Sequence, residues 1–130
     1  MAPPFTVSMK PIEGSMVNKP RQLGTAWEGE IKNYLRTHGF PEADREDFSS
    51  PLGDIKGTPV TLEAKNCKSL TWGAWVIQVK KADAKTGRNM PVIVAKKRNA
   101  NVKEAYFMTD LEHGVILMKA LEICREKGLL

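Results

Sequence analysis

Two carboxylates and a lysine in the middle of the chain have the residue types and spacing of a metal-dependent hydrolytic site. Glu63 follows Asp54 by nine residues, and Lys65 lies two residues further on. The alternating pattern of residues 60–65 predicts a strand, which puts Glu63 and Lys65 on one face, roughly 7 Å apart. A turn at residues 56–58 folds the preceding segment back, so that Asp54 faces this pair. Carboxylate oxygens that converge from neighbouring strands suit Mg²⁺, which takes few protein ligands and keeps its waters.

Lys65 adds a positive charge to this predicted site. An ammonium group beside two carboxylates is suited to meet a phosphoryl oxygen or to help activate a metal-bound water. On an ordinary half-exposed strand, however, a Glu-x-Lys pair is usually only a solvated face, so the spacing alone has this second interpretation. The chemistry therefore depends on the elements that bring Asp54 to Glu63.

The apolar pattern around these residues predicts an α/β fold, in which helices flank a mixed β-sheet. The predicted elements are, in chain order, a helix over 22–38, a short strand near 43–48, a strand or strand end over 52–55, a strand over 60–65, a helix over 72–85, strands over 92–95 and 105–108, and a helix over 109–127. Residues 1–21 contain four prolines and predict a flexible N-terminal arm. Residues 22–130 are then a single domain.

The last predicted helix carries two specific expectations. Thr109, with Glu112 three positions later, has the pattern of a capping box and predicts the start of the helix. The predicted apolar face consists of Leu111, Val115, Met118 and Leu121. Because such a face covers the core in most small domains, we expect this helix to pack against the sheet.

Charge is distributed unevenly along the chain. Residues 28–63 hold eight acids and four bases, whereas residues 64–103 hold ten bases and one acid, within a net charge of +5. Basic faces of this size are often only solvated surface. The alternative is a bound polyanion on the basic part, with the acids gathered where a cation must sit.

Other features of the sequence exclude several classes of protein. Cys67 and Cys124 lie 57 positions apart without further ligands nearby, so they form neither a zinc spacing nor a disulfide framework. No apolar run approaches the roughly 20 residues that a membrane span needs. The first residues also lack the pattern of a signal peptide. We therefore expect a cytoplasmic protein with free thiols and no membrane partner.

The order of these motifs resembles the PD-(D/E)XK nucleases, whose pattern is an Asp at the end of one strand and a Glu-x-Lys on the next. Within that superfamily the chain is most similar to archaeal and phage Holliday junction resolvases, over roughly residues 23–98. The resemblance rests on GTAWEGEIKNYLRTHGF, GDI, LEAKN, WVIQVKKA and PVIVAKKR. It implies a restriction-endonuclease-like core. The chain departs from the family pattern at Gly53, where the family name has proline.

The resemblance also implies the roles of the site residues. Asp54 and Glu63 would be metal ligands, and Lys65 the catalytic lysine. Glu28, on the first helix, would reach the metal directly or through water, and Gln78 matches a polar position near the site. The implied cofactor is Mg²⁺, for which Mn²⁺ would substitute. Two of these roles have plainer alternatives, because Glu28 also fits a helix-end capping pattern and Gln78 also fits a solvated helix flank.

The basic side chains are the candidates for contacts with DNA phosphates. We expect such contacts from Arg45, Lys56, Lys68, Lys80, Lys81, Lys96, Lys97 and Arg98. The last three follow a buried strand, and their alternative is a solvated turn. Binding through phosphates carries little sequence information and depends strongly on salt, because each neutralised phosphate releases counterions.

The sequence and its resemblance together predict a metal-dependent, structure-specific endonuclease that resolves four-way DNA junctions. A four-way junction is two-fold symmetric and needs two nicks, which favours a homodimer. Two alternatives stay open: a flap- or end-processing nuclease of recombination or replication, and a basic DNA-binding protein without nuclease activity. If the chain is phage-encoded, as the type of resemblance implies, the compartment is the host cytoplasm.

Overall fold

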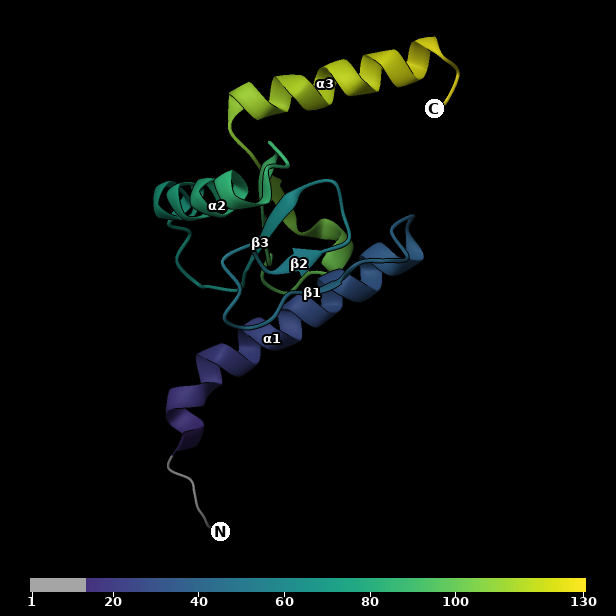
Figure 1. Ribbon diagram of the computed structural model, residues 1–130. Helices are drawn as coiled ribbons and strands as arrows, with labels where there is room; N and C mark the ends of the chain where they lie inside the picture. Colours follow the sequence, from purple (N-terminus) through teal and green to yellow (C-terminus); the bar gives the residue numbers. More distant parts are fainter. Residues whose placement is uncertain (1–13) are drawn as a thin grey trace.

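The computed structural model describes residues 14–130 of the chain, with side chains from residue 24 onward. Figure 1 shows three helices around a small sheet. The elements are α1 (Gly14–Thr37), β1 (Asp44–Arg45), β2 (Ile55–Lys56), β3 (Thr61–Lys65), α2 (Trp72–Thr86), β4 (Pro91–Ala95), the 3₁₀ helix η1 (Val102–Glu104), β5 (Tyr106–Met108) and α3 (Leu111–Glu126).

The sheet has five strands in the order β1-β2-β3-β4-β5. β3 and β4 are parallel, whereas β1–β2, β2–β3 and β4–β5 are antiparallel. The connection between the parallel strands contains α2, as a parallel crossover requires. The predicted α/β class with a mixed sheet is thus confirmed, and the arrangement is compatible with a restriction-endonuclease-like core.

Helix α1 covers one face of the sheet. Trp27 and Ile31 on this helix form a buried cluster with Ile55 of β2 and Leu62 of β3. Each large apolar side chain buried in this way contributes about 1.5–3 kcal/mol. The indole Nε1 of Trp27 donates a hydrogen bond to the carbonyl oxygen of Val94 at 3.2 Å, which ties α1 to β4.

Helix α2 covers the opposite face. Trp75 and Val79 pack there against Ile93 and Ala95 of β4. Because successive residues of a strand point to opposite faces, β4 serves both clusters. The helix ends at Gly87, whose φ of 72° is the left-handed cap that glycine adopts without strain.

Helix α1 begins earlier than the sequence predicts. It starts at Gly14 rather than residue 22, so residues 14–21, which we expected in a flexible arm, are helical. A helix can propagate through backbone hydrogen bonds without burying a face, so apolar periodicity does not locate such an end. Residues 1–13 of the predicted arm lie outside the described residues.

Helix α3 differs from its prediction in two respects. Its N-cap is Asp110, whose side chain accepts from the backbone N–H of His113, and not Thr109. The Thr109 hydroxyl instead donates to the carbonyl oxygen of Pro91 at 2.6 Å. The expected packing of this helix against the sheet is also wrong, because all four residues of the predicted apolar face are exposed: Leu111 (78%), Val115 (43%), Met118 (57%) and Leu121 (40%).

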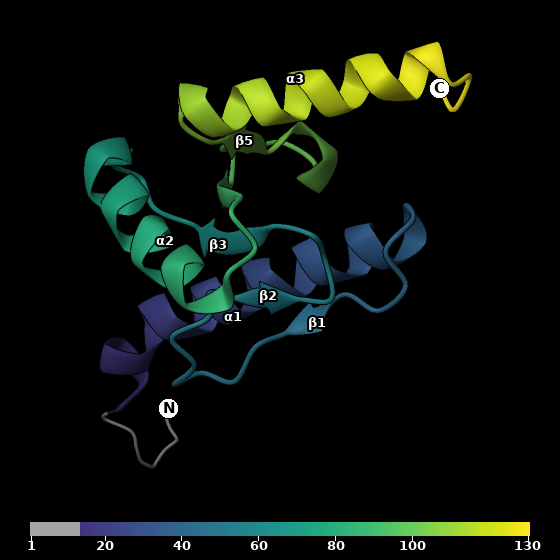
Figure 2. The same cartoon turned by 45° about the horizontal axis from the view of Figure 1, so that its top comes forward.

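The position of α3 explains this difference. Figures 1 and 2 show the helix extending past β5 and away from the sheet. His113 near its start is its only buried residue. Among the described helices, none combines the length and apolar character needed to cross a membrane.

Candidate functional site

Asp54 and Glu63 lie together where β2 and β3 meet. Ile55 pairs with Leu62 in this antiparallel ladder, and Asp54 directly precedes β2. Beyond the ladder, the backbone N–H of Asp54 donates to the carbonyl oxygen of Leu62 at 2.8 Å. The side chains of Asp54 and Glu63 are joined by a hydrogen bond. The end of the ladder therefore brings the two acids together.

The backbone around Asp54 is held in place, and Gly53 is essential to it. Gly53 has a φ of 97°, and a Cβ there would lie 3.0 Å from the carbonyl oxygen of Leu62. Proline fixes φ near −65° and cannot adopt this conformation. A proline at position 53 would therefore not fit this local backbone. The Asp54 carboxylate in turn accepts the N–H of Ala64 at 2.8 Å, which orients it towards β3.

Glu63 is an acid in an environment that opposes its charge. Its exposure is 6%. Burial, the charge of Asp54 and a hydrogen bond with Asp54 together raise the pKa of Glu63 to about 8, against the opposing charge of Lys65. At neutral pH without a cation, Glu63 therefore carries a proton. A divalent cation between the two carboxyl groups would replace that proton and balance both charges.

Lys65 stands beside this pair at the end of β3. Its ammonium group donates to the side-chain carbonyl oxygen of Gln78 at 2.6 Å and lies 6.0 Å from the centre of the Trp75 ring. Both partners are on α2, so the helix positions the lysine. A cation is thereby held next to two carboxylates, on the face of the strand that the alternation predicts.

Glu28 reaches the same region from α1. It lines a cleft of about 180 Å³ together with Gly24, Thr25, Arg45, Glu46, Asp47, Phe48 and Asp54. Arg45 donates to its carboxylate at 3.2 Å. Burial and the charge of Asp54 raise the pKa of Glu28, whereas the hydrogen bond and charge of Arg45 lower it. The cleft is therefore acidic, with one guanidinium group inside it.

The three predicted metal ligands do not meet as one compact group. Among the described side chains, the group whose ligand atoms all lie within 4.8 Å of one another, and which could hold a metal ion, is Asp110, Glu112 and His113. Asp54 and Glu63 form a pair, and Glu28 faces it from the cleft, bound to Arg45. A role for Glu28 through a bridging water fits this placement better than direct ligation.

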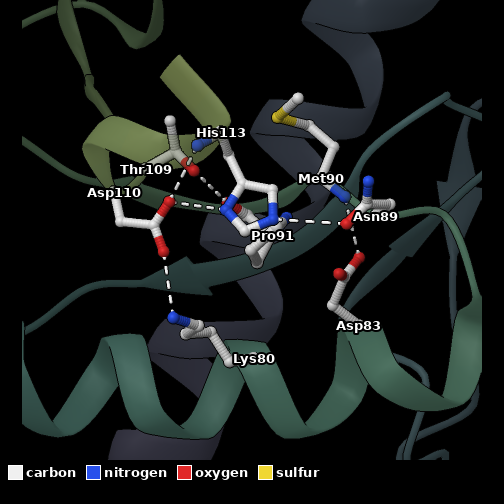
Figure 3. Close-up of polar contacts among 8 residues, drawn as sticks. All are labelled: Lys80, Asp83, Asn89, Met90, Pro91, Thr109, Asp110 and His113. Carbon is white, nitrogen blue, oxygen red and sulfur yellow. Dashed lines mark hydrogen bonds and ion pairs between the residues drawn. The ribbon is translucent and has the colours of Figure 1, made fainter. Parts of the chain in front are cut away.

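The group at Asp110 is already satisfied by protein partners, as Figure 3 shows. One carboxylate oxygen accepts the backbone N–H of His113 at 3.0 Å and contacts its ring Nδ1 at 2.5 Å. The other oxygen lies 3.0 Å from the ammonium group of Lys80 on α2. These hydrogen bonds hold the pKa of Asp110 well below its usual range. The contacts anchor the first turn of α3 to α2.

Sequence reasoning missed this cluster. It assigned no role to His113 and placed Lys80 among the DNA contacts, whereas Lys80 pairs with Asp110. The only local signal was an aspartate three residues before a histidine at a helix start. The lysine comes from another helix, so no spacing in the sequence could reveal it.

The structure brings together four of the eight predicted DNA-binding residues. A pocket of about 260 Å³ beyond the ends of β3 and β4 is lined by Cys67, Lys68, Leu70, Lys96, Lys97, Arg98 and Tyr106. Lys68 and Lys97 are exposed. Arg98 donates to the side chain of Asn66, and Lys96 to Glu30 at 3.4 Å. This basic pocket follows directly on the strand that carries Lys65.

The other four candidates are dispersed. Arg45 lies in the acidic cleft and Lys80 in the α3 anchor. Lys56 on β2 and Lys81 on α2 are exposed. Positive charge is thus concentrated at one end of the parallel strands and is not spread along the whole sheet.

Comparison with known proteins found no matching family model, no similar curated protein and no similar solved structure. Functional conclusions therefore rest on the residues of this chain and their geometry.

Proposed function

We propose that this protein is a metal-dependent endonuclease that hydrolyses phosphodiester bonds in branched DNA, with the four-way junction as its substrate. The observation that carries this proposal is the hydrogen-bonded contact between the Asp54 and Glu63 carboxyl groups, with the charge of Lys65 beside them. A buried pair of acids with a lysine beside it fits both a divalent cation and a phosphate.

The residues of this pair fit a divalent metal ion. Glu63 is buried and its pKa is raised to about 8, so the charge of Lys65 compensates the pair only in part. When bound there, Mg²⁺ or Mn²⁺ lowers the pKa of a coordinated water and neutralises charge on the phosphate. Asp54 and Glu63 would be the protein ligands, and Glu28 would orient a water at the edge of the site.

Lys65 would stabilise the negative charge that develops on the phosphate oxygens during hydrolysis. Such stabilisation depends on a donor that is already in position before the reaction. The hydrogen bond to Gln78 at 2.6 Å provides this position. Gln78 therefore acts as a positioning residue, which holds the lysine without touching the substrate.

The basic pocket supports DNA as the substrate. Lys68, Lys96, Lys97 and Arg98 lie around it, beyond the strand ends that carry the site. A DNA backbone that crosses the site towards this pocket would meet a cation at successive phosphates. Because a four-way junction requires two opposed nicks, the active species would be a homodimer with two such sites.

The decisive experiment compares cleavage of a labelled four-way junction, a flap and a linear duplex. The wild type, Glu63→Gln and Glu104→Gln are assayed with Mg²⁺ and with EDTA. Glu104→Gln is the matched control, because it makes the same change at an exposed acid on η1. We expect paired, symmetric nicks in the junction that need metal, vanish in Glu63→Gln and persist in the control.

Two other results would lead to a different function. Cleavage of the flap in preference to the junction would favour a flap- or end-processing nuclease that uses the same chemistry. Junction binding without cleavage in either Mg²⁺ or Mn²⁺ would favour a DNA-binding protein and overturn the nuclease proposal.

A further inference from the structure

The C-terminal helix α3 has an apolar side that nothing in the described chain covers. The side consists of Ile116, Leu117, Ala120, Leu121, Ile123 and Cys124. Ile116, Leu117, Leu121 and Ile123 are 43%, 37%, 40% and 49% exposed. The charged residues of the helix lie at other positions around its axis, so α3 is amphipathic. An uncovered apolar side of this length is typical of an interaction surface.

Within the described residues, the helix is fixed to the domain only at its start. Asp110 and His113 bind it to α2 and to the loop before β4 (Figure 3). In the described part of the chain, no hydrogen bond or ion pair joins residues 115–126 to another helix or strand. A single 16-residue helix is only marginally stable in water without tertiary packing. Its outer turns therefore need a partner.

We propose that this partner is α3 of a second copy of the chain, packed antiparallel about a two-fold axis. Ile116, Ala120 and Ile123 recur at the four- and three-residue spacing of a helix-pairing seam. The small side chain of Ala120 allows the two helices to approach closely beside the larger side chain of Ile123. A two-fold pair of this kind is self-complementary, as isologous contacts require.

The charges beside the seam favour the antiparallel arrangement. Lys119 and Glu126 are seven residues apart, so they flank the seam on the same side. In an antiparallel pair, the flank of one helix faces the same flank of the partner helix. With Ala120 packed beside Ile123 of the partner subunit, Lys119 of each copy lies opposite the partner subunit's Glu126. The pairing thus forms two identical ion pairs.

The same charges argue against nucleic acid or an acidic membrane surface on this helix. α3 contains three acids and two bases: Glu112, Glu122, Glu126, Lys119 and Arg125. Polyanionic partners require an excess of positive charge, which is found instead at the basic pocket. The inference gives the proposed homodimer a surface and extends the proposed function, but its experimental test uses neither DNA nor metal.

The test is the mass of the full chain in solution. We expect the wild type at tens of micromolar to show the dimer mass by light scattering after size-exclusion chromatography. Ile123→Glu places a charge in the seam and should weaken association at least tenfold. Met118→Glu makes the same kind of change at an exposed residue on the opposite side of the helix, so it should remain dimeric.

A charge exchange tests the orientation of the pair. Lys119→Glu and Glu126→Lys should each weaken the dimer, and the double variant should restore it, because the reciprocal ion pairs are then reversed. Lys119 also lies 3.8 Å from Glu122 in its own helix, and this contact is not restored in the double variant. Restored association therefore reports the contact between copies.

The proposal fails if the wild type has the monomer mass at these concentrations, or if Met118→Glu dissociates the dimer as Ile123→Glu does. Binding of the monomer to lipid vesicles would assign the apolar side to a membrane surface instead. These outcomes are separate from the nuclease proposal. A monomer that cuts junctions would overturn the interface and the proposed dimeric active species but not the nuclease chemistry, and a dimer that cuts no DNA would overturn only the activity.

Discussion

The protein contains two clusters of ionisable groups whose environments are opposite. The side chains of Asp54 and Glu63 are hydrogen-bonded to each other at the end of the β2–β3 ladder, and the pKa of Glu63 is raised to about 8. Asp110 accepts hydrogen bonds from His113 and pairs with Lys80, and its pKa is well below the usual range. The first cluster concentrates negative charge in a buried place. The second supplies each carboxylate oxygen with a donor from the protein.

This difference distinguishes the proposed site from a structural contact. A carboxylate with its own donors stabilises the folded chain and has little free energy left for a ligand. Two opposed carboxylates destabilise the folded chain until a proton or a cation is bound. Strongly perturbed acids beside a cleft are typical of functional sites. Proximity of ligand atoms alone would select Asp110, Glu112 and His113, whereas the electrostatics select Asp54 and Glu63.

The largest expected effect is on cleavage. Asp54→Asn removes the charge but keeps an oxygen that can accept the N–H of Ala64. Loss of several kcal/mol of transition-state stabilisation lowers the rate by roughly a thousandfold. Junction binding should persist or tighten, because a charge that repels phosphate is removed. Cleavage rates and binding isotherms for the same junction give both quantities.

Asp110→Asn is the matched control for this substitution, since it makes the same change in the satisfied cluster. It should cut junctions at the rate of the wild type. If Asp54→Asn instead lost folding and binding together, Asp54 would be structural, and the distinction between the clusters would disappear.

An intermediate effect is expected on the pH dependence of stability. The pKa of Glu63 rises from 4.5 to about 8 on folding, so between these values the folded chain binds more protons than the unfolded chain. In EDTA, the contribution of Glu63 is therefore complete below pH 4.5 and declines as pH rises towards 8. Glu63→Gln should lack this decline and unfold at a higher temperature than the wild type at pH 8.

Added Mg²⁺ tests whether Glu63 takes part in binding the metal. At pH 8 it should raise the unfolding temperature of the wild type by several degrees and that of Glu63→Gln by less, because ligands that bind only the folded state stabilise it. Thermal unfolding followed by circular dichroism measures all four conditions. Equal stabilisation of the two proteins would place the metal elsewhere, and the Asp110 group would become the first candidate.

The smallest effect is expected at the α3 anchor. Asp110→Ala removes the N-cap and the Lys80 pair, whereas Asp110→Ser keeps a side chain that can cap the helix. We expect unfolding temperatures a few degrees lower for alanine and nearer the wild type for serine. Because the folded-state pKa of Asp110 is lowered, its stabilisation is present at neutral pH and is lost on acidification below about 3.8. An alanine variant as stable as the wild type at pH 7 would show that the anchor contributes nothing.

Much of the fold follows from local patterns in the sequence. The alternation of residues 60–65 predicts a strand, and β3 occupies Thr61–Lys65. The helix predicted over 72–85 is α2, which ends before Gly87 as expected. Periodicities of two and about 3.6 residues are set by backbone geometry, so each segment carries its own signal.

Local patterns in the sequence predicted only part of the candidate site. A turn between two strands was enough to predict that Asp54 faces Glu63. The need for glycine at position 53 was not visible, because it follows from a φ of 97° and from the approach of the Leu62 carbonyl oxygen. The pairing of Arg45 with Glu28 was also hidden, since it joins residues 17 positions apart on different elements.

The C-terminal helix α3 shows most clearly what the sequence could predict and what it could not. For α3, the sequence determined where a helix lies, because helix-forming residues and their apolar spacing are local signals. Only the tertiary structure decided which side turns inward, since that depends on where Asp110 and His113 meet α2. In the same way, the sequence determined which residues carry charge, and the fold alone decided which charges lose their water and which gain a partner. Burial and distance set that outcome, and both are properties of segments far apart in the chain.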